Sequence, residues 1–310
     1  MKSLGVHLGL VAVLWALCLV LPAYHQGNFA RVMVLAVYAM GYNVLFGYTG
    51  LLSLGHAMFF AAGMYGTGLV SLHWGTPMVL ALPLGVLAGA VLAALLGVLF
   101  LRAKGVGFMI VTLMFAQAVY LTILYFGEWT GGDEGFVLQP AVRVLAGIDL
   151  TAPSARYWTA WAIFSVGFLA TYWLVGRPFG KTLVAIRENE ERARMLGYDT
   201  FRFKWQAVVI SGALSGLAGA TYGMLFGYVG ASFATVQYSI FPLLWVLLGG
   251  AGTVIGPFIG TLFMFYLIDF SSEITTAYML IAGVALVLLT LFAPQGIVGE
   301  LRRRVFGWLP

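Results

Sequence analysis

The chain has 310 residues, of which 62% are hydrophobic and 9% are charged, and its mean hydropathy is +0.97. This composition is typical of polytopic helical membrane proteins and excludes an ordinary soluble domain. The formal charge of +5 would indicate an anionic partner for a soluble protein, but in a membrane protein it has to be divided between the two sides. Gaps between apolar runs are shorter than about 30 residues, too short for a separate core. We therefore expect a single transmembrane domain over residues 1–310.

Ten apolar runs of roughly membrane-spanning length follow one another along the chain. They cover residues 4–22, 30–47, 51–72, 77–101, 106–126, 157–175, 206–229, 239–250, 255–270 and 276–293. The first run resembles a signal peptide, but no small-x-small cleavage pattern follows it, which favours a retained helix. The runs at 239–250 and 255–270 are short and glycine-interrupted, which is also typical of broken or re-entrant helices. The fold class expected is an all-α polytopic membrane protein with about ten transmembrane helices.

A five-residue pattern occurs twice, as FGYTG at residues 46–50 and as FGYVG at residues 226–230. Each copy stands at the end of an apolar run. With ten spans the two copies fall on opposite sides of the membrane, as an inverted-topology repeat would place them. Two short windows in a Gly- and Tyr-rich chain can also agree by chance, so both interpretations stay open.

The segment 177–204 is the most strongly charged part of the chain, with seven basic and four acidic residues. On a helix Glu190 could pair with Arg194, and Arg187 with Glu191, because each pair is four residues apart. Gly197 stands where a helix commonly ends. Leu183, Ile186, Met195 and Leu196 are its candidate apolar contacts. We interpret the segment as a short amphipathic helix that serves as a docking element.

Basic residues are divided unequally between the two sets of connections. One set holds 13 of the 16: Lys2, Arg102, Lys104, the seven in 177–204, Arg302, Arg303 and Arg304. The other holds only Arg31, Arg143 and Arg156. The positive-inside rule then places both termini and the 177–204 loop in the cytoplasm, and the loop 127–156 outside. Glycines at 131, 132 and 135 predict tight turns in that outer loop.

No catalytic or metal-binding pattern occurs: the four histidines are scattered, and Cys18 is the only cysteine. The middle of every span lacks Asp and Glu, which argues against a proton- or sodium-coupled carrier. Polar residues at membrane depth are neutral, and those chosen as candidates to line a substrate path are Asn43, Ser53, His56, Thr67, Thr112 and Gln117. His56 and Thr67 share one helical face. Each could equally be hydrogen-bonded between packed helices.

Three stretches carry a family resemblance. They are GYTGLLSLGHAMFFAAGMYGTGLV at residues 47–70, TGGDEGF at residues 130–136, and GRPFGKTLVAIRENEERARMLGYDTFRFK at residues 176–204. Over about residues 30–295 the chain resembles the inner-membrane permeases of branched-chain amino acid ABC importers, and the third stretch resembles the cytoplasmic loop of the M-type subunit. Urea and short-amide permeases share the same framework, so the motifs are less specific for the substrate.

The resemblance implies a subunit of the bacterial inner membrane that pairs with a second, H-type permease. Two cytoplasmic ATPases and an extracytoplasmic binding protein complete the implied assembly. Glu191, Ala193 and Gly197 fit the E-x-A-x3-G spacing of the ATPase-contacting loop, although Arg192 departs from its usual second alanine. The coupling residues expected are Lys181, Arg187, Glu190, Glu191, Arg194 and Gly197. The chain itself is expected to be no enzyme, to bind no cofactor, metal or nucleic acid, and to leave ATP to its partners.

Alternating access is the expected mechanism, with a helix at 180–197 transmitting the motion of the ATPases. A largely apolar path with a few neutral polar groups suits a zwitterion with an aliphatic side chain. Three alternatives stay open: an ABC permease for urea or short amides, a self-sufficient secondary carrier or channel, and a structural membrane scaffold.

Overall fold

The computed structural model of the chain describes residues 2–304, with Met1 and residues 305–310 outside the described part. Apolar runs form helices because a chain in lipid has to satisfy its backbone groups internally. The helices of the first half are α1 (Lys2–Val20), α2 (Ala23–Asn43), α3 (Ala57–Trp74), α4 (Met78–Phe100), α5 (Val106–Tyr125) and α6 (Gly127–Thr130). Those of the second half are α7 (Pro153–Gly176), α8 (Pro178–Glu188), α9 (Glu190–Met195), α10 (Thr200–Phe226), α11 (Val236–Gly249), α12 (Gly256–Ile274), α13 (Tyr278–Phe292) and α14 (Gly296–Arg304).

Short elements connect these helices. The π-helix η1 (Val44–Tyr48) extends α2, and the 3-10 segments are η2 (Pro140–Val142) and η3 (Ala231–Ala234). Four two-residue strands are described: β1 (Phe136–Val137), β2 (Val144–Leu145), β3 (Ile148–Asp149) and β4 (Tyr228–Val229). They form two antiparallel pairs, β1 with β4 and β2 with β3.

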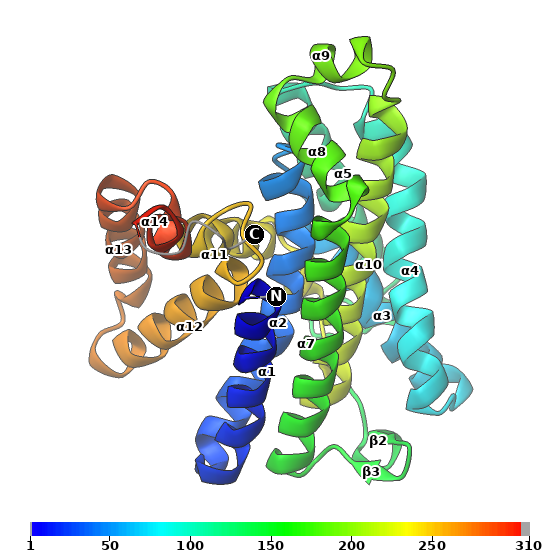
Figure 1. Cartoon of the computed structure of the whole chain (residues 1–310). Coiled ribbons are helices and arrows are strands. Elements are labelled where there is room, and N and C mark those ends of the chain that lie inside the picture. The colour runs from blue at the N-terminus through cyan, green and yellow to red at the C-terminus, as the bar shows by residue number, and fades with distance from the viewer. Residues whose placement is uncertain (1, 305–310) are drawn as a thin grey trace.

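The centre of the bundle is α10, which packs against α2, α3 and α4 (Figure 1). Glycines permit this close approach: a Cβ added to Gly63 on α3 would lie 2.1 Å from the carbonyl oxygen of Gly216 on α10. On its other side α2 contacts α7 and α12. Helices α11 to α14 lie together on one side of the bundle in Figure 1.

Each of the ten predicted apolar runs contains a helix, and the all-α polytopic membrane fold is confirmed. Among the described residues six helices are long and apolar enough to cross a membrane. Two further apolar helices are shorter, at Leu4–Val20 and Val236–Gly249. The second of these corresponds to the first of the two runs for which broken or re-entrant helices were considered. The other run, 255–270, forms α12, which is one of the six helices long enough to cross.

One predicted span begins later than the apolar pattern indicates. Residues 51–56 are not helical, and α3 starts only at Ala57. The chain turns at Gly50, where φ is +76°. It then passes so close to α5 that a Cβ on Gly55 would lie 1.9 Å from the carbonyl oxygen of Thr112. The run 51–72 therefore contains an irregular approach segment followed by a helix.

The two long polar segments lie at opposite ends of the bundle, with α8 and α9 at one end and β2 and β3 at the other (Figure 1). The glycines at 131, 132 and 135 all have positive φ, which confirms the tight turns predicted for the outer loop. The predicted cytoplasmic positions of the chain termini fall partly on Met1, residues 305–310 and the side chains of Lys2 and Arg304, which lie outside the described part.

The two copies of the repeated pentapeptide also lie at opposite ends, but their backbones differ. The first forms the end of η1, where a Cβ on Gly47 would collide with the side chain of Asn43. The second caps α10 with Gly227 at φ +73° and continues into β4, which pairs with β1 of the outer loop. The local structures are thus not copies of one another, and the larger inverted repeat stays a prediction.

Candidate functional site

The charged segment at the α8–α9 end is two helices rather than the single helix predicted. Asn189 lies between α8 and α9 with extended backbone angles of φ −159° and ψ 102°. Its side chain accepts a hydrogen bond from the backbone N–H of Arg192 at 2.9 Å, so it caps α9. The break removes the helical spacing between Arg187 and Glu191, so the predicted pairing of these two is wrong. Arg187 instead contacts Glu188 at 2.8 Å.

Glu190 is the centre of a polar cluster that closes the segment onto the start of α10. Its carboxylate accepts hydrogen bonds from Lys204 at 2.5 Å and from Arg194 and Thr200 at 3.2 Å each. The predicted Glu190–Arg194 pair is therefore confirmed. Burial opposes ionisation of Glu190, but the Lys204 ammonium and the other donors outweigh it and hold the pKa of this carboxyl below its usual value.

The segment is attached firmly to the membrane helices. Leu183 on α8 is buried in a cluster with Val44, Tyr48 and Ala207, which belong to η1 and α10. Arg187 donates a hydrogen bond to the backbone carbonyl of Gly47 in η1, which extends α2. A displacement of α8 would consequently be felt by α2 and α10 together.

From the end of α9 to the start of α10 the chain presents exposed apolar residues, Met195, Leu196, Tyr198 and Phe201, which together are called the docking face. Met195 is 85% exposed and Leu196 is 73% exposed. Gly197 directly follows Leu196 and has φ +89°, a left-handed backbone conformation that is typical of the residue after a helix end. Of the predicted apolar contacts, Leu183 and Ile186 pack inward and Met195 and Leu196 do not.

The remaining predicted coupling residues belong to the same two helices, Lys181 to α8 and Glu191 to α9. Lys181 and Glu191 are exposed and form no ion pair within residues 2–304. A cavity of about 350 Å³ beside α9 is lined by Lys104 from the α4–α5 connection and by Arg187, Glu190 and Lys204. The structure therefore brings the six predicted coupling residues to one end of the bundle.

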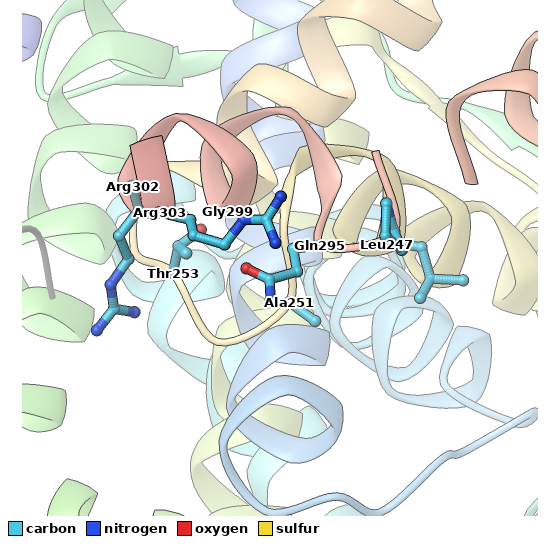
Figure 2. A pocket seen from close by; sticks show the side chains of 8 residues that line it. Leu247, Ala251, Thr253, Gln295, Gly299, Arg302 and Arg303 are labelled. Carbon is cyan, nitrogen blue, oxygen red and sulfur yellow. The ribbon is translucent and has the colours of Figure 1, made fainter. Parts of the chain in front are cut away.

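A second cavity, of about 490 Å³, lies between the end of α11, the turn that follows it, and α14. Figure 2 shows Arg302 and Arg303 extending from α14, with Gln295 and Thr253 nearby. Arg303 is paired with Glu300 at 2.6 Å. The turn is attached to α2 by Asn43, whose side chain donates to the carbonyl of Thr253 at 2.8 Å.

His56 is the best placed of the predicted path residues for a specific interaction. It is fully buried, and its Nε2 lies 2.8 Å from the Ser215 hydroxyl and 3.2 Å from the Ser211 hydroxyl. Both serine hydroxyls also donate to backbone carbonyls, Ser211 to Gly41 at 2.6 Å and Ser215 to Ser211 at 2.8 Å. Because each serine hydroxyl already donates its proton to a carbonyl, it can only accept a hydrogen bond from His56. We therefore infer that His56 is protonated at Nε2, where it donates, and unprotonated at Nδ1.

The other predicted path residues lie in different places. Asn43 is buried and satisfied at both ends of its amide, since it also accepts from Gly252 at 2.9 Å. Thr67 donates to the carbonyl of Ala81 at 3.2 Å, and so connects α3 with α4. The Ser53 hydroxyl accepts a hydrogen bond from the backbone N–H of Gly55, and the Thr112 hydroxyl accepts one from the backbone N–H of Leu54. Both bonds hold the irregular segment before α3. Gln117 is exposed on α5.

The structure therefore does not bring the six together around one cavity, and their role as a path stays a prediction. Ser211 and Ser215 are not among the residues predicted from the sequence to line a path. Their four-residue spacing on α10 was the available signal for a second polar position facing His56.

Comparison with known proteins identifies the family. The model described as "Branched-chain amino acid transport system / permease component" matches residues 27–292. The chain is 29% identical to the high-affinity branched-chain amino acid transport system permease protein LivM of Salmonella typhimurium, over 86% of this chain and 68% of that one. A probable LivM of Methanocaldococcus jannaschii is 26% identical over 70% of this chain and 68% of its own.

A more distant kind of relative matches part of the chain. The autoinducer 2 import system permease protein LsrC of Klebsiella pneumoniae is 29% identical over 44% of this chain and 40% of its own length. No solved structure matches the chain. Because the family model spans most of the sequence and the fold is polytopic and helical, the protein belongs to the permease components of branched-chain amino acid transport systems.

Proposed function

We propose that this chain is the membrane-spanning permease subunit of an ATP-driven importer and translocates branched-chain amino acids across the bacterial inner membrane. The family and the LivM relatives support this class of substrate. The concentration of basic residues around α8 and α9 supports a cytoplasmic location for that end.

The partners proposed are a second permease of the H type, two cytoplasmic ATPases, and an extracytoplasmic binding protein. The ATPases dock on the docking face and the exposed charges beside it. The binding protein delivers substrate at the opposite end, near the outer loop. The chain binds no cofactor of its own, and ATP is used by the partner ATPases.

One observation carries the proposal: an exposed apolar face is joined rigidly to the central helices. Met195 and Leu196 are exposed within a segment that is otherwise rich in charged residues, and an exposed apolar patch of this kind is typical of a protein–protein contact. The Glu190 cluster connects that face to α10, and Arg187 connects it to α2 through Gly47. Movement of bound ATPases would thereby reach both helices and open the path alternately to either side.

Co-purification tests this proposal directly. The double variant Met195→Asp, Leu196→Asp places two charges in the docking face without touching the Glu190 cluster. We expect the wild-type chain to retain two ATPases and a second permease, and the variant to lose the ATPases but keep the second permease. Ile148→Asp is the matched control, because Ile148 is 53% exposed at the opposite end of the bundle.

The control variant should retain both ATPases and the second permease. Recovery of the wild-type chain without ATPases would contradict the importer proposal and favour a self-sufficient carrier. If the double variant retained the ATPases, the proposed position of the docking face would be wrong, but the importer proposal would stand.

A further inference from the structure

A third cavity lies on the side of the bundle where α2, α10, α11 and α12 meet. Its volume is about 360 Å³, within the range of roughly 300–1,000 Å³ that small-molecule sites occupy. Aromatic rings form most of its wall, among them Tyr222, Phe233, Phe241 and Trp245. Such a wall favours an apolar group that fits between rings.

Two opposite charges line the same aromatic cavity. Arg31 comes from α2 and Asp269 from α12. Arg31, counted with the outer connections in the sequence analysis, instead stands eight residues into α2, about 12 Å along its axis. Asp269 stands five residues before the end of α12, about 7.5 Å. Ionisable groups at this depth in a membrane protein are costly unless they have a function or a partner.

Neither charge is neutralised by another residue of the described part of the chain. Arg31 forms no ion pair there, and its guanidinium lies over the ring of Phe226, 5.0 Å from the centroid. Asp269 accepts hydrogen bonds only from neutral donors, the Tyr24 hydroxyl at 3.2 Å and the Asn28 amide at 3.4 Å. These contacts hold both groups in place and leave their charges available to a ligand.

The cavity continues inward as an aromatic chain. Tyr238 contacts Tyr38 with ring centroids 6.1 Å apart, and Tyr38 in turn stacks on His56 at 5.6 Å. Because Tyr238 lines the same cavity as Arg31 and Asp269, a row of rings leads from the cavity to the buried His56. A ligand held in the cavity would face this row.

We propose that this cavity binds an α-amino acid zwitterion, with Arg31 receiving its carboxylate, Asp269 its ammonium group, and the aromatic wall its aliphatic side chain. The assignment rests on the proposed function and adds the site at which the substrate is held. A zwitterion neutralises both charges at once. Urea, amides and sugars carry no charges to do so.

Substrate protection tests the site in membranes that contain the full chain and its native partners. Ser272 lines the cavity, so Ser272→Cys is labelled with a methanethiosulfonate reagent in a Cys18→Ala background. Leucine is expected to slow this labelling, and Arg31→Gln to abolish the protection while Arg31→Lys retains part of it. Ser154→Cys, exposed at the start of α7, is the matched control and should be labelled at the same rate with or without leucine.

Two analogues separate the two charges. Leucinol lacks the carboxylate and isocaproate lacks the ammonium group. Each should need at least about ten times the concentration of leucine for equal protection, which corresponds to about 1.4 kcal/mol. Asp269→Asn should remove the difference between leucine and isocaproate.

The outcomes distinguish this site from the proposed function. If leucine gives no protection while the intact transporter still imports leucine with ATP, the site is wrong and the function stands. If leucine protects but uptake needs no ATP, the site stands and the ATP-driven mechanism is wrong. Equal protection by leucine, leucinol and isocaproate would contradict recognition of the zwitterion.

Discussion

At the scale of single residues, His56 is held by a network that depends on which groups carry protons. Ser211 and Ser215 both donate to backbone carbonyls, so they can only accept from the imidazole. The histidine is therefore fixed as a donor at Nε2 and oriented between α2 and α10. Its position is structural first, whatever it contributes to a path.

We predict that Ser215→Ala destabilises the chain by about 1–3 kcal/mol, because the buried Nε2–H loses its shorter partner at 2.8 Å and the desolvation cost remains. The thermal melting temperature of the purified chain in detergent measures this. Thr122→Ala is the matched control, since Thr122 on exposed α5 also donates to a carbonyl one turn earlier, at 2.8 Å.

The control should change the melting temperature little. Equal melting temperatures for Ser215→Ala and the wild type would contradict the assigned hydrogen bond between His56 and Ser215.

At the scale of elements, the contact between α3 and α10 depends on the absence of side chains. A Cβ on Gly63 would lie 2.1 Å from the carbonyl oxygen and 2.5 Å from the Cα of Gly216. These are backbone atoms, which cannot rotate aside as a side chain would.

We therefore expect Gly63→Ala to separate the two helices and destabilise the bundle by at least about 1–3 kcal/mol, the usual cost of overpacking. The yield of folded chain in the membrane and its melting temperature are the measurements. Gly9→Ala is the control, because nothing lies within 4 Å of the Cβ it would add on α1. If Gly63→Ala were as stable as the wild type, the close contact between Gly63 and Gly216 would be contradicted.

The Glu190 cluster makes a prediction about pH. Because the folded pKa of Glu190 is lowered, its carboxylate stabilises the folded chain above its unfolded pKa of about 4.3, and this contribution is lost as pH falls through the lower, folded value. The wild type should therefore melt at a higher temperature than Glu190→Gln at neutral pH. The difference in melting temperature should shrink as the pH falls below about 4.3 and disappear below the folded pKa.

Glu191→Gln is the control for this series, since it removes an exposed carboxylate that forms no ion pair in the described part of the chain. If the difference in melting temperature between wild type and Glu190→Gln grew toward acid pH, the lowered pKa assigned to Glu190 would be contradicted.

At the scale of the whole molecule, hydropathy was sufficient to locate the ten long apolar helices but not their interruptions. All ten apolar runs contain helix, because lipid leaves the backbone few alternatives. The irregular segment 51–56 was predicted as part of a helix because it is continuous with the apolar run that follows it. Its cause is a tertiary contact, the approach of Gly55 to Thr112.

The candidate sites were predictable to different degrees for a similar reason. The coupling segment could be predicted from its charge. Its division into two helices was missed, although Asn189 followed by Glu190 and Glu191 is a typical helix start, because the four-residue spacing of charges favoured one continuous helix. The pair of Arg31 and Asp269 could not be found by spacing. The two residues are 238 positions apart, and only the packing of α12 beside α2 brings them to one cavity.

ATP-driven uptake of labelled leucine into proteoliposomes tests the central claim most directly. The liposomes contain this chain with its co-purified permease and ATPases, and the binding protein is added on the side of the outer loop. We predict uptake that requires both ATP and the binding protein and that is lost in the double variant Met195→Asp, Leu196→Asp. Leucine uptake by the chain alone without ATP, or ATP-driven uptake of urea in place of leucine, would contradict the account.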